Sequence, residues 1–224
     1  LAVKHRIKIE WSVLDFYIFK RDRGALVSDP LWRKAFLEKV MTPILKEFGQ
    51  HPGILAWDAM NEPDWAVRKE DSGDADTETT TTLKALRDYV NELSDLVHLH
   101  TKQYATVGCA SLKWLGMEHE FWNGLRVDYY EAHYYGWMKK WFDPLEHPYE
   151  SLNLDKPCVI GEFPGHAKDT GHTVLELIEG FHQAGYAGAW AWMWRGDGAM
   201  EAGAFKGAML EFSKRHAGDG LEKK

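Results

Sequence analysis

The sequence GILAWDAMNEPDW at Gly53–Trp65 contains an apolar, strand-like run that ends in Glu62 beside residues that form turns. A second stretch of the same kind, CVIGEFPGH at Cys158–His166, has Glu162 in the matching place, 100 residues further along the chain. The sequence therefore predicts two carboxylates, each placed where a buried strand ends.

Around these two runs, strand-like and helix-like segments alternate along the chain. Strands are expected at 7–16, 54–60, 104–110, 127–134, 157–163 and 188–194, and helices at 29–48, 83–97, 173–184 and 205–216. Because parallel neighbours need a crossover connection, usually a helix, this alternation predicts an α/β fold with a parallel sheet.

The first long helix carries sequence signals for its start and for a bend. Asp29 and Pro30 supply a cap and a first-turn proline, and Pro43 is expected to bend the helix because it lacks a backbone donor. The predicted buried stripe consists of Trp32, Phe36, Val40, Ile44 and Phe48.

Length and composition limit the possible classes of protein. The 224 residues, 45% of them hydrophobic, suit one large domain or two small ones with a sizeable core. A net charge of -7 argues against nucleic acid as a partner and favours a neutral substrate. The sequence contains no run of about 18 apolar residues, so a membrane partner is not expected. Cys109 and Cys158 lie in apolar runs and are predicted to be buried free thiols. Several of the eleven tryptophans lie in Gly-, Pro- and Asp-rich stretches, where they suit stacking on sugar rings.

Residues 66–82 are predicted to form a mobile acidic surface loop. Three aspartates in it could suggest calcium, but their spacing lacks the glycine and the distal glutamate of a standard calcium loop. These aspartates are Asp71, Asp74 and Asp76. The sequence predicts no metal and no cofactor.

Two glutamates at strand ends suit the hydrolysis of a glycosidic bond. That reaction needs one carboxylic acid to protonate the leaving oxygen and one carboxylate to attack the sugar or to activate water. The acid keeps its proton when it is desolvated, whereas the carboxylate stays ionised through hydrogen bonds or positive charge. A helix cap would explain Glu62 alone, but it would not require a matched glutamate on a second strand.

Four runs, WDAMNEP, EAHYYGW, VIGEFPG and WAWMWRGDG, resemble the ends of strands four, six, seven and eight of clan A glycoside hydrolases. The most similar are family 5 enzymes of the cellulase and β-mannanase type, and the match extends from about Ile7 onward. The resemblance implies a fold of the (β/α)8 TIM-barrel type. The barrel is expected to be incomplete, with about six βα units that correspond to strands three to eight. A single catalytic domain over residues 1–224 is expected, without the first two βα units and the arginine that relatives carry after strand two. At the end of strand three, where many relatives have a histidine, this sequence reads Leu14, Asp15 and Phe16.

The resemblance also assigns catalytic roles. Glu62 would be the general acid/base, Glu162 would be the nucleophile, and Asn61 would bind the sugar 2-hydroxyl. The carboxyl groups of retaining enzymes lie about 5 to 5.5 Å apart, so a double displacement is expected.

Further substrate-binding residues follow from the same resemblance. His133 and Tyr135 match a His-x-Tyr pair after strand six, although an ordinary buried histidine is the alternative for His133. Trp194, or else Trp192, would form the floor under the cleaved sugar. Two more tryptophans at strand ends could be sugar platforms or could pack loops, namely Trp65 and Trp137.

The predicted activity is retaining hydrolysis of a β-1,4-linked glucan or mannan. The alternative is a carbohydrate-binding pseudoenzyme or an inactive barrel fragment, because two strands are expected to be missing. Two chains could also pair as a homodimer that covers the open edges of the sheet. The family favours a secreted or periplasmic protein, and the compartment stays open because no signal peptide is visible in this chain.

Overall fold

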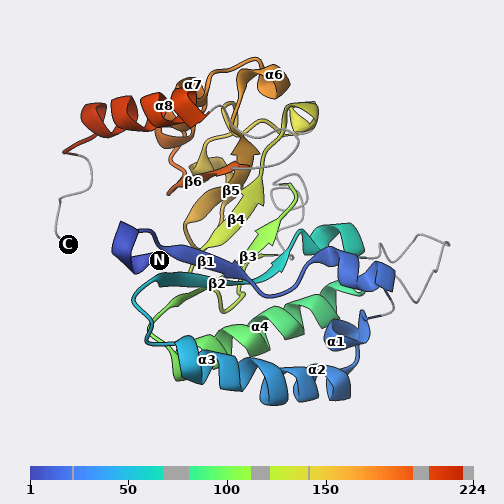
Figure 1. The fold of residues 1–224 in the computed structure, drawn as a ribbon. Coiled ribbons are helices and arrows are strands. Elements are labelled where there is room, and N and C mark those ends of the chain that lie inside the picture. Colours follow the sequence, from blue (N-terminus) through green and yellow to red (C-terminus); the bar gives the residue numbers. More distant parts are fainter. Residues whose placement is uncertain (22, 68–80, 112–121, 141, 194–201, 219–224) are drawn as a thin grey trace. The chain divides into compact units, whose positions relative to one another are not determined.

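A computed structural model describes the chain except for residues 22, 68–80, 112–121, 141, 194–201 and 219–224 (Figure 1). Most of the predicted acidic loop therefore lies outside the described residues. Six strands of the described part are hydrogen-bonded in chain order. They are β1 (Ile9–Ser12), β2 (Ile54–Asn61), β3 (Tyr104–Cys109), β4 (Tyr130–His133), β5 (Cys158–Pro164) and β6 (Ala189–Trp192). The pairs β1–β2, β2–β3 and β5–β6 are parallel, which confirms the predicted arrangement.

Two compact units make up the chain. The first comprises Leu1–Ala110, Met117–Glu131 and Asp155–Pro157, and the second comprises Ser111–Gly116, Ala132–Leu154 and Cys158–Lys224. A single domain over residues 1–224 stays a prediction, and each unit is described by itself.

The first unit packs helices against β1, β2 and β3. Its helices are α1 (Ala25–Ser28), α2 (Pro30–Phe36), α3 (Thr42–Phe48) and α4 (Leu83–His100), with the 3-10 turns η1 (Val3–His5), η2 (Phe16–Arg21) and η4 (Pro63–Ala66) and the π turn η3 (Leu37–Met41). In Figure 1, α2, α3 and α4 lie together along one side of β1 and β2. The core between the layers contains fully buried side chains such as Trp57, Val107, Leu45, Leu86 and Leu93.

The helical segment 29–48 confirms its predicted ends but not its predicted buried face. The Asp29 side chain caps α2, and the π turn η3 comes immediately before the segment that contains Pro43. The predicted stripe was wrong, since Trp32 is 62% exposed and Val40 and Phe48 are also exposed. The buried side chains are one position further along, at Arg33, Leu37, Met41 and Leu45. A charged residue can lie at the start of this buried stripe because the Arg33 guanidinium donates a hydrogen bond to each carboxylate oxygen of Glu92, both at 3.0 Å.

The pairing of β2 with β3 is irregular near the end of β2. The pairing shifts between Asp58 and Asn61, so that Asn61 lies opposite Gly108. The Asp58 carboxylate accepts hydrogen bonds from the backbone N–H groups of Met60 and Gly108, both at 3.0 Å, and from the Ser12 hydroxyl at 2.5 Å. A bulge leaves backbone groups without ladder partners, and here one buried side chain replaces those partners.

The second unit contains β5, β6 and the helices that follow them. These are α6 (Ala167–Thr170), α7 (Val174–Gln183) and α8 (Ala202–Arg215), with the 3-10 turns η5 (Gly136–Met138) and η6 (Tyr149–Leu152). Phe181 of α7 makes edge-to-face contacts with Tyr134, Phe163 and Tyr186 in the core of this unit. A capping box between Thr173 and Glu176 begins α7 at the predicted position.

Three features of the composition can be compared with the structure. Cys109 and Cys158 are buried free thiols, as predicted. On the last strand Trp190 and Trp192 are both exposed, and Trp194 lies outside the described residues. The strand of Trp190 and Trp192, β6, comes last in the sheet order of the described residues, where it pairs with β5. Among the described helices, none has the length and apolar character needed to cross a membrane.

Candidate active site

Glu62 follows β2 in a backbone conformation that few residues adopt. Its φ of 49° and ψ of 45° are left-handed, which costs a residue with a side chain about 1–2 kcal/mol. Its N–H donates to the Gly108 carbonyl at 2.7 Å, and Pro63 then begins η4. Such strain persists where the surrounding structure fixes it, and it is concentrated at functional sites.

The indole of Trp65 contacts the same glutamate. Its Nε1–H donates to Glu62 Oε2 at 3.2 Å, and half of the Trp65 side chain is exposed. Trp65 thus combines a hydrogen bond to the predicted acid/base with an exposed aromatic face, and its role as a sugar platform stays a prediction.

Asn61 is fixed from the neighbouring strand end. Its Nδ2 donates to Asp15 Oδ2 at 2.8 Å, and the backbone of these two residues forms a parallel bridge. The backbone N–H of Asn61 also donates to the Leu14 carbonyl at 2.9 Å. The side chain expected to bind a sugar hydroxyl is therefore held at the end of β2 by main-chain and side-chain bonds together.

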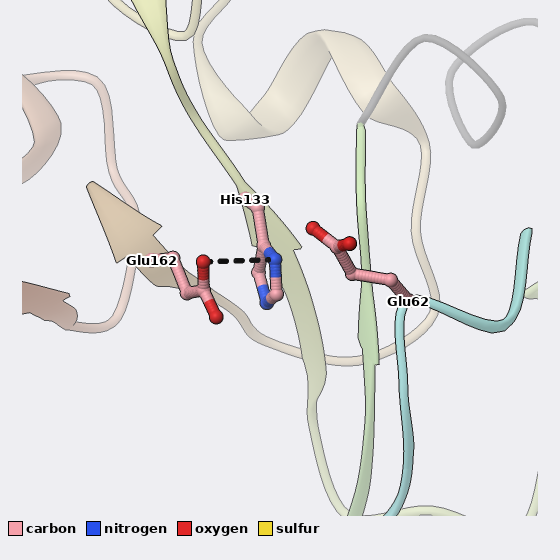
Figure 2. Close-up of side chains that lie close together, drawn as sticks. All are labelled: Glu62, His133 and Glu162. Carbon is pink, nitrogen blue, oxygen red and sulfur yellow. Dashed lines mark ion pairs between the residues drawn. The ribbon is translucent and has the colours of Figure 1, made fainter. Parts of the chain in front are cut away.

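Glu162 lies in β5 beside two of the predicted substrate-binding residues. The Tyr135 hydroxyl donates to Glu162 Oε2 at 2.5 Å, and His133 Nδ1 lies 3.5 Å from the same oxygen. Figure 2 shows the imidazole of His133 facing the carboxylate of Glu162, with Glu62 drawn on the turn after β2. The His133 side chain is buried and that of Glu162 is 15% exposed. The second unit thus brings together three residues that the sequence placed on two separate strands.

The strand register explains this arrangement. The Tyr134 N–H donates to the Glu162 carbonyl at 2.8 Å, which aligns the end of β4 with the middle of β5. Side chains alternate along an extended chain, so His133 and Tyr135 share one face while Tyr134 points to the other and packs on Phe181.

A group of buried acids in the first unit was missed by the sequence reasoning. Burial, followed by the charge of Glu10, raises the pKa of Asp58 to about 6 even though the Ser12 hydroxyl bond opposes it. Burial and then the charge of Glu10 raise the pKa of Glu131 well above its ordinary value. Tyr129 donates its hydroxyl to Glu10, and burial raises its own pKa. The available signal was Glu131 in EAHYYGW, an acid at even spacing from His133 within an apolar strand.

The remaining predicted platforms are placed individually. Trp137 is in η5 and 48% exposed, and Trp192 ends β6 and is 50% exposed. Trp194, the preferred floor residue, lies outside the described residues. Exposed aromatic rings near strand ends suit stacking on sugars, and all three roles stay predictions.

The order and direction of the strands indicate the fold class of the chain. Parallel strands in chain order, most of them linked by helices, are typical of (β/α) barrels, of which the described residues form six strands where a complete barrel has eight. The chain is similar in structure to a β-1,4-mannanase from the sea hare Aplysia kurodai, with a TM-score of 0.76 and 21% identity over 94% of this chain and 68% of that chain. It is also similar to a β-mannanase from the blue mussel Mytilus edulis, with a TM-score of 0.75 and 19% identity over the same shares of the two chains.

A sequence comparison points to the same group. The chain is 21% identical over 200 residues to a mannan endo-1,4-beta-mannosidase of Mytilus edulis, a match that covers 75% of this chain and 54% of that protein. The chain thus spans about half the length of the curated relative it matches. No protein-family model matches it. Together the comparisons confirm the (β/α)-barrel fold class and the predicted resemblance to glycoside hydrolases of the β-mannanase type.

Proposed function

We propose that the chain acts as a retaining glycoside hydrolase on a β-1,4-linked mannan. The observation that carries this proposal is the environment of Glu162. Its carboxylate accepts a hydrogen bond from the Tyr135 hydroxyl at 2.5 Å and lies beside the imidazole of His133. Hydrogen bonds to the charged form of a carboxyl group favour that form, which a nucleophile requires.

Glu162 attacks the anomeric carbon in the first step. The carbon–oxygen bond to the leaving sugar breaks as a covalent glycosyl ester forms on Glu162, and Glu62 gives its proton to the departing oxygen. Water then attacks the anomeric carbon, the bond from that carbon to Glu162 breaks to release the carboxylate, and Glu62 takes a proton from the water. The anomeric carbon is inverted twice, so its configuration is retained.

Glu62 suits the acid/base role through its position. The left-handed turn after β2 and the Gly108 carbonyl fix its backbone, and the Trp65 indole fixes one of its carboxylate oxygens. A group that transfers a proton twice in one cycle benefits from such fixed geometry, because proton transfer depends on reach before it depends on pKa.

Mannan is favoured over glucan by the named activities of the relatives. The sea hare and mussel proteins are mannanases by name, and the curated relative is an endo-1,4-beta-mannosidase. Each of the exposed rings at Trp65, Trp137 and Trp192 suits stacking on a neutral sugar. The cellulase branch of the predicted resemblance receives no comparable support.

The test measures release of reducing sugar from β-1,4-mannan and from cellulose, side by side. The proposal expects hydrolysis of mannan that Glu162→Gln abolishes while binding of mannohexaose persists. Glu47→Gln, the same change on an exposed position of α3, serves as the matched control and should be fully active. Binding of mannohexaose without any hydrolysis by the wild-type chain would indicate the carbohydrate-binding alternative. Undiminished hydrolysis by Glu162→Gln would contradict the role of this glutamate.

A further inference from the structure

The carboxylate of Asp15 bonds two groups at the carboxyl end of β1. Its Oδ1 accepts the backbone N–H of Tyr17 at 2.8 Å, and its Oδ2 accepts the Asn61 side-chain Nδ2–H at 2.8 Å. The first bond forms the turn that begins η2, and the second reaches 46 residues along the sequence to the end of β2.

The backbone makes this contact a fixed one. Beyond the end of β1 the chain continues beside β2, because the Val13 N–H donates to the Asp58 carbonyl and the Asn61 N–H donates to the Leu14 carbonyl, both at 2.9 Å. A parallel bridge between Asp15 and Asn61 completes the pairing. The two side chains leave neighbouring strands at one level, so their separation is set by the main chain.

The carboxylate also decides which way the Asn61 amide faces. An ionised carboxylate only accepts hydrogen bonds, whereas a side-chain amide has a donating and an accepting end. Only the NH2 end of Asn61 can therefore face Asp15, and the carbonyl oxygen is turned to the other side. The second N–H and the carbonyl oxygen then have fixed directions toward a ligand.

We propose that Asp15 is a positioning residue that sets the orientation of the Asn61 amide for the sugar 2-hydroxyl. This inference rests on the proposed function, in which Asn61 binds that hydroxyl beside the reacting carbon. Bonds to the 2-hydroxyl strengthen in the transition state of glycoside hydrolysis, so a misdirected amide slows the chemical step more than it weakens binding.

The decisive variant is Asp15→Asn. The new amide keeps the shape of the side chain, and its oxygen can still accept the Tyr17 N–H. Its NH2 group then faces Asn61 and forces that amide to turn over, so the hydrogen bond survives with the opposite polarity. A purely structural Asp15 would be rescued by this replacement, whereas a positioning Asp15 would not.

Kinetics on mannohexaose provide the first readout. We expect Asp15→Asn to lower kcat about 10- to 100-fold with KM within about twofold, as loss of one transition-state hydrogen bond predicts. Its Tm should stay within about 2 °C of the wild type, while Asp15→Ala should lower both kcat and Tm. The control is Asp29→Asn at the cap of α2, where a single oxygen accepts both N–H groups, so that activity and Tm should hardly change. Wild-type kinetics for Asp15→Asn would overturn the inference, and so would a loss of activity that parallels a loss of Tm.

A second readout is independent of turnover. In 15N-labelled protein, the side-chain amide signals of Asn61 should move in Asp15→Asn, where the carboxylate that accepts the Asn61 N–H is lost, and should stay in place in Asp29→Asn. Asn61 amide signals that keep their wild-type positions in Asp15→Asn would overturn the inference whatever the activity. A wild-type chain that neither hydrolyses nor binds mannan would instead contradict the proposed function, and the amide signals would still decide the role of Asp15.

Discussion

The buried Asp58 predicts an unusual dependence of stability on pH. Burial raises the pKa of this carboxyl from 3.8 to about 6, so the folded chain holds a proton between these values that the unfolded chain has released. Stability therefore falls as the pH rises through this window, whereas an ordinary salt-bridged carboxylate gains stability as the pH rises toward its unfolded pKa. At about 1.36 kcal/mol per pKa unit, the shift corresponds to about 3 kcal/mol of unfolding free energy. The side chain is only 3% exposed, so solvent hardly screens the effect.

Asp58→Asn isolates this contribution. The replacement stays neutral and its oxygen can still accept the N–H groups of Met60 and Gly108, while its NH2 group can donate to Ser12. Urea unfolding followed by tryptophan fluorescence, at a series of pH values from 4 to 8, measures the free energy of unfolding of both proteins.

The expected result is similar stability at pH 4 and an advantage of about 3 kcal/mol for Asp58→Asn above pH 6. Asp58→Ala, by contrast, should be less stable at every pH, because each buried N–H group left without an acceptor costs about 1–3 kcal/mol. Parallel pH profiles for the wild type and Asp58→Asn would refute the reasoning, since they would mean that the folded chain does not hold the extra proton.

Three further perturbations test the second unit. Tyr135→Phe removes the hydroxyl that donates a hydrogen bond to Glu162, so kcat on mannan should fall about 10- to 100-fold while Tm stays unchanged. Full activity would contradict the role of that hydrogen bond. Gly136→Ala would place a Cβ 2.0 Å from the Asp169 carbonyl oxygen, so calorimetry should show a loss of about 1–3 kcal/mol, and an unchanged Tm would mean that the loop yields freely. Thr173→Ala removes the capping box of α7 and should cost about 1 kcal/mol in urea unfolding without affecting turnover, whereas no loss would show that the cap contributes little.

Sequence patterns predicted the layout of the sheet because strand-like runs and helix caps are local signals. The alternation of strands and helices, the Asp29 cap and the strand-end glutamates all depend on residues close together in sequence. The buried face of the segment 29–48 was predicted one position too early, since the sequence alone does not show that Arg33 is buried and pairs with Glu92, 59 residues away.

The supporting residues of the site could not be predicted for the same reason. Asp15 acquires its role only when β1 and β2 lie side by side, 46 residues apart in sequence. Asp58 acts on the Gly108 N–H across a bulge, and the position of a bulge depends on how two strands pair rather than on either strand alone. The motif residues Asn61 and Glu62 were visible as a pattern, whereas the groups that orient them appear only in three dimensions.

The most direct test of the central claim is chemical trapping of the nucleophile. A β-mannobiosyl fluoride that carries fluorine at C2 slows the second step of a double displacement more than the first, so the glycosyl ester accumulates. Intact-mass measurement followed by peptide mapping should find one sugar label on the peptide that contains Glu162, and none in Glu162→Gln. No label on a chain that hydrolyses mannan, or a label on a different residue, would contradict the assignment of Glu162 as the nucleophile of a retaining enzyme.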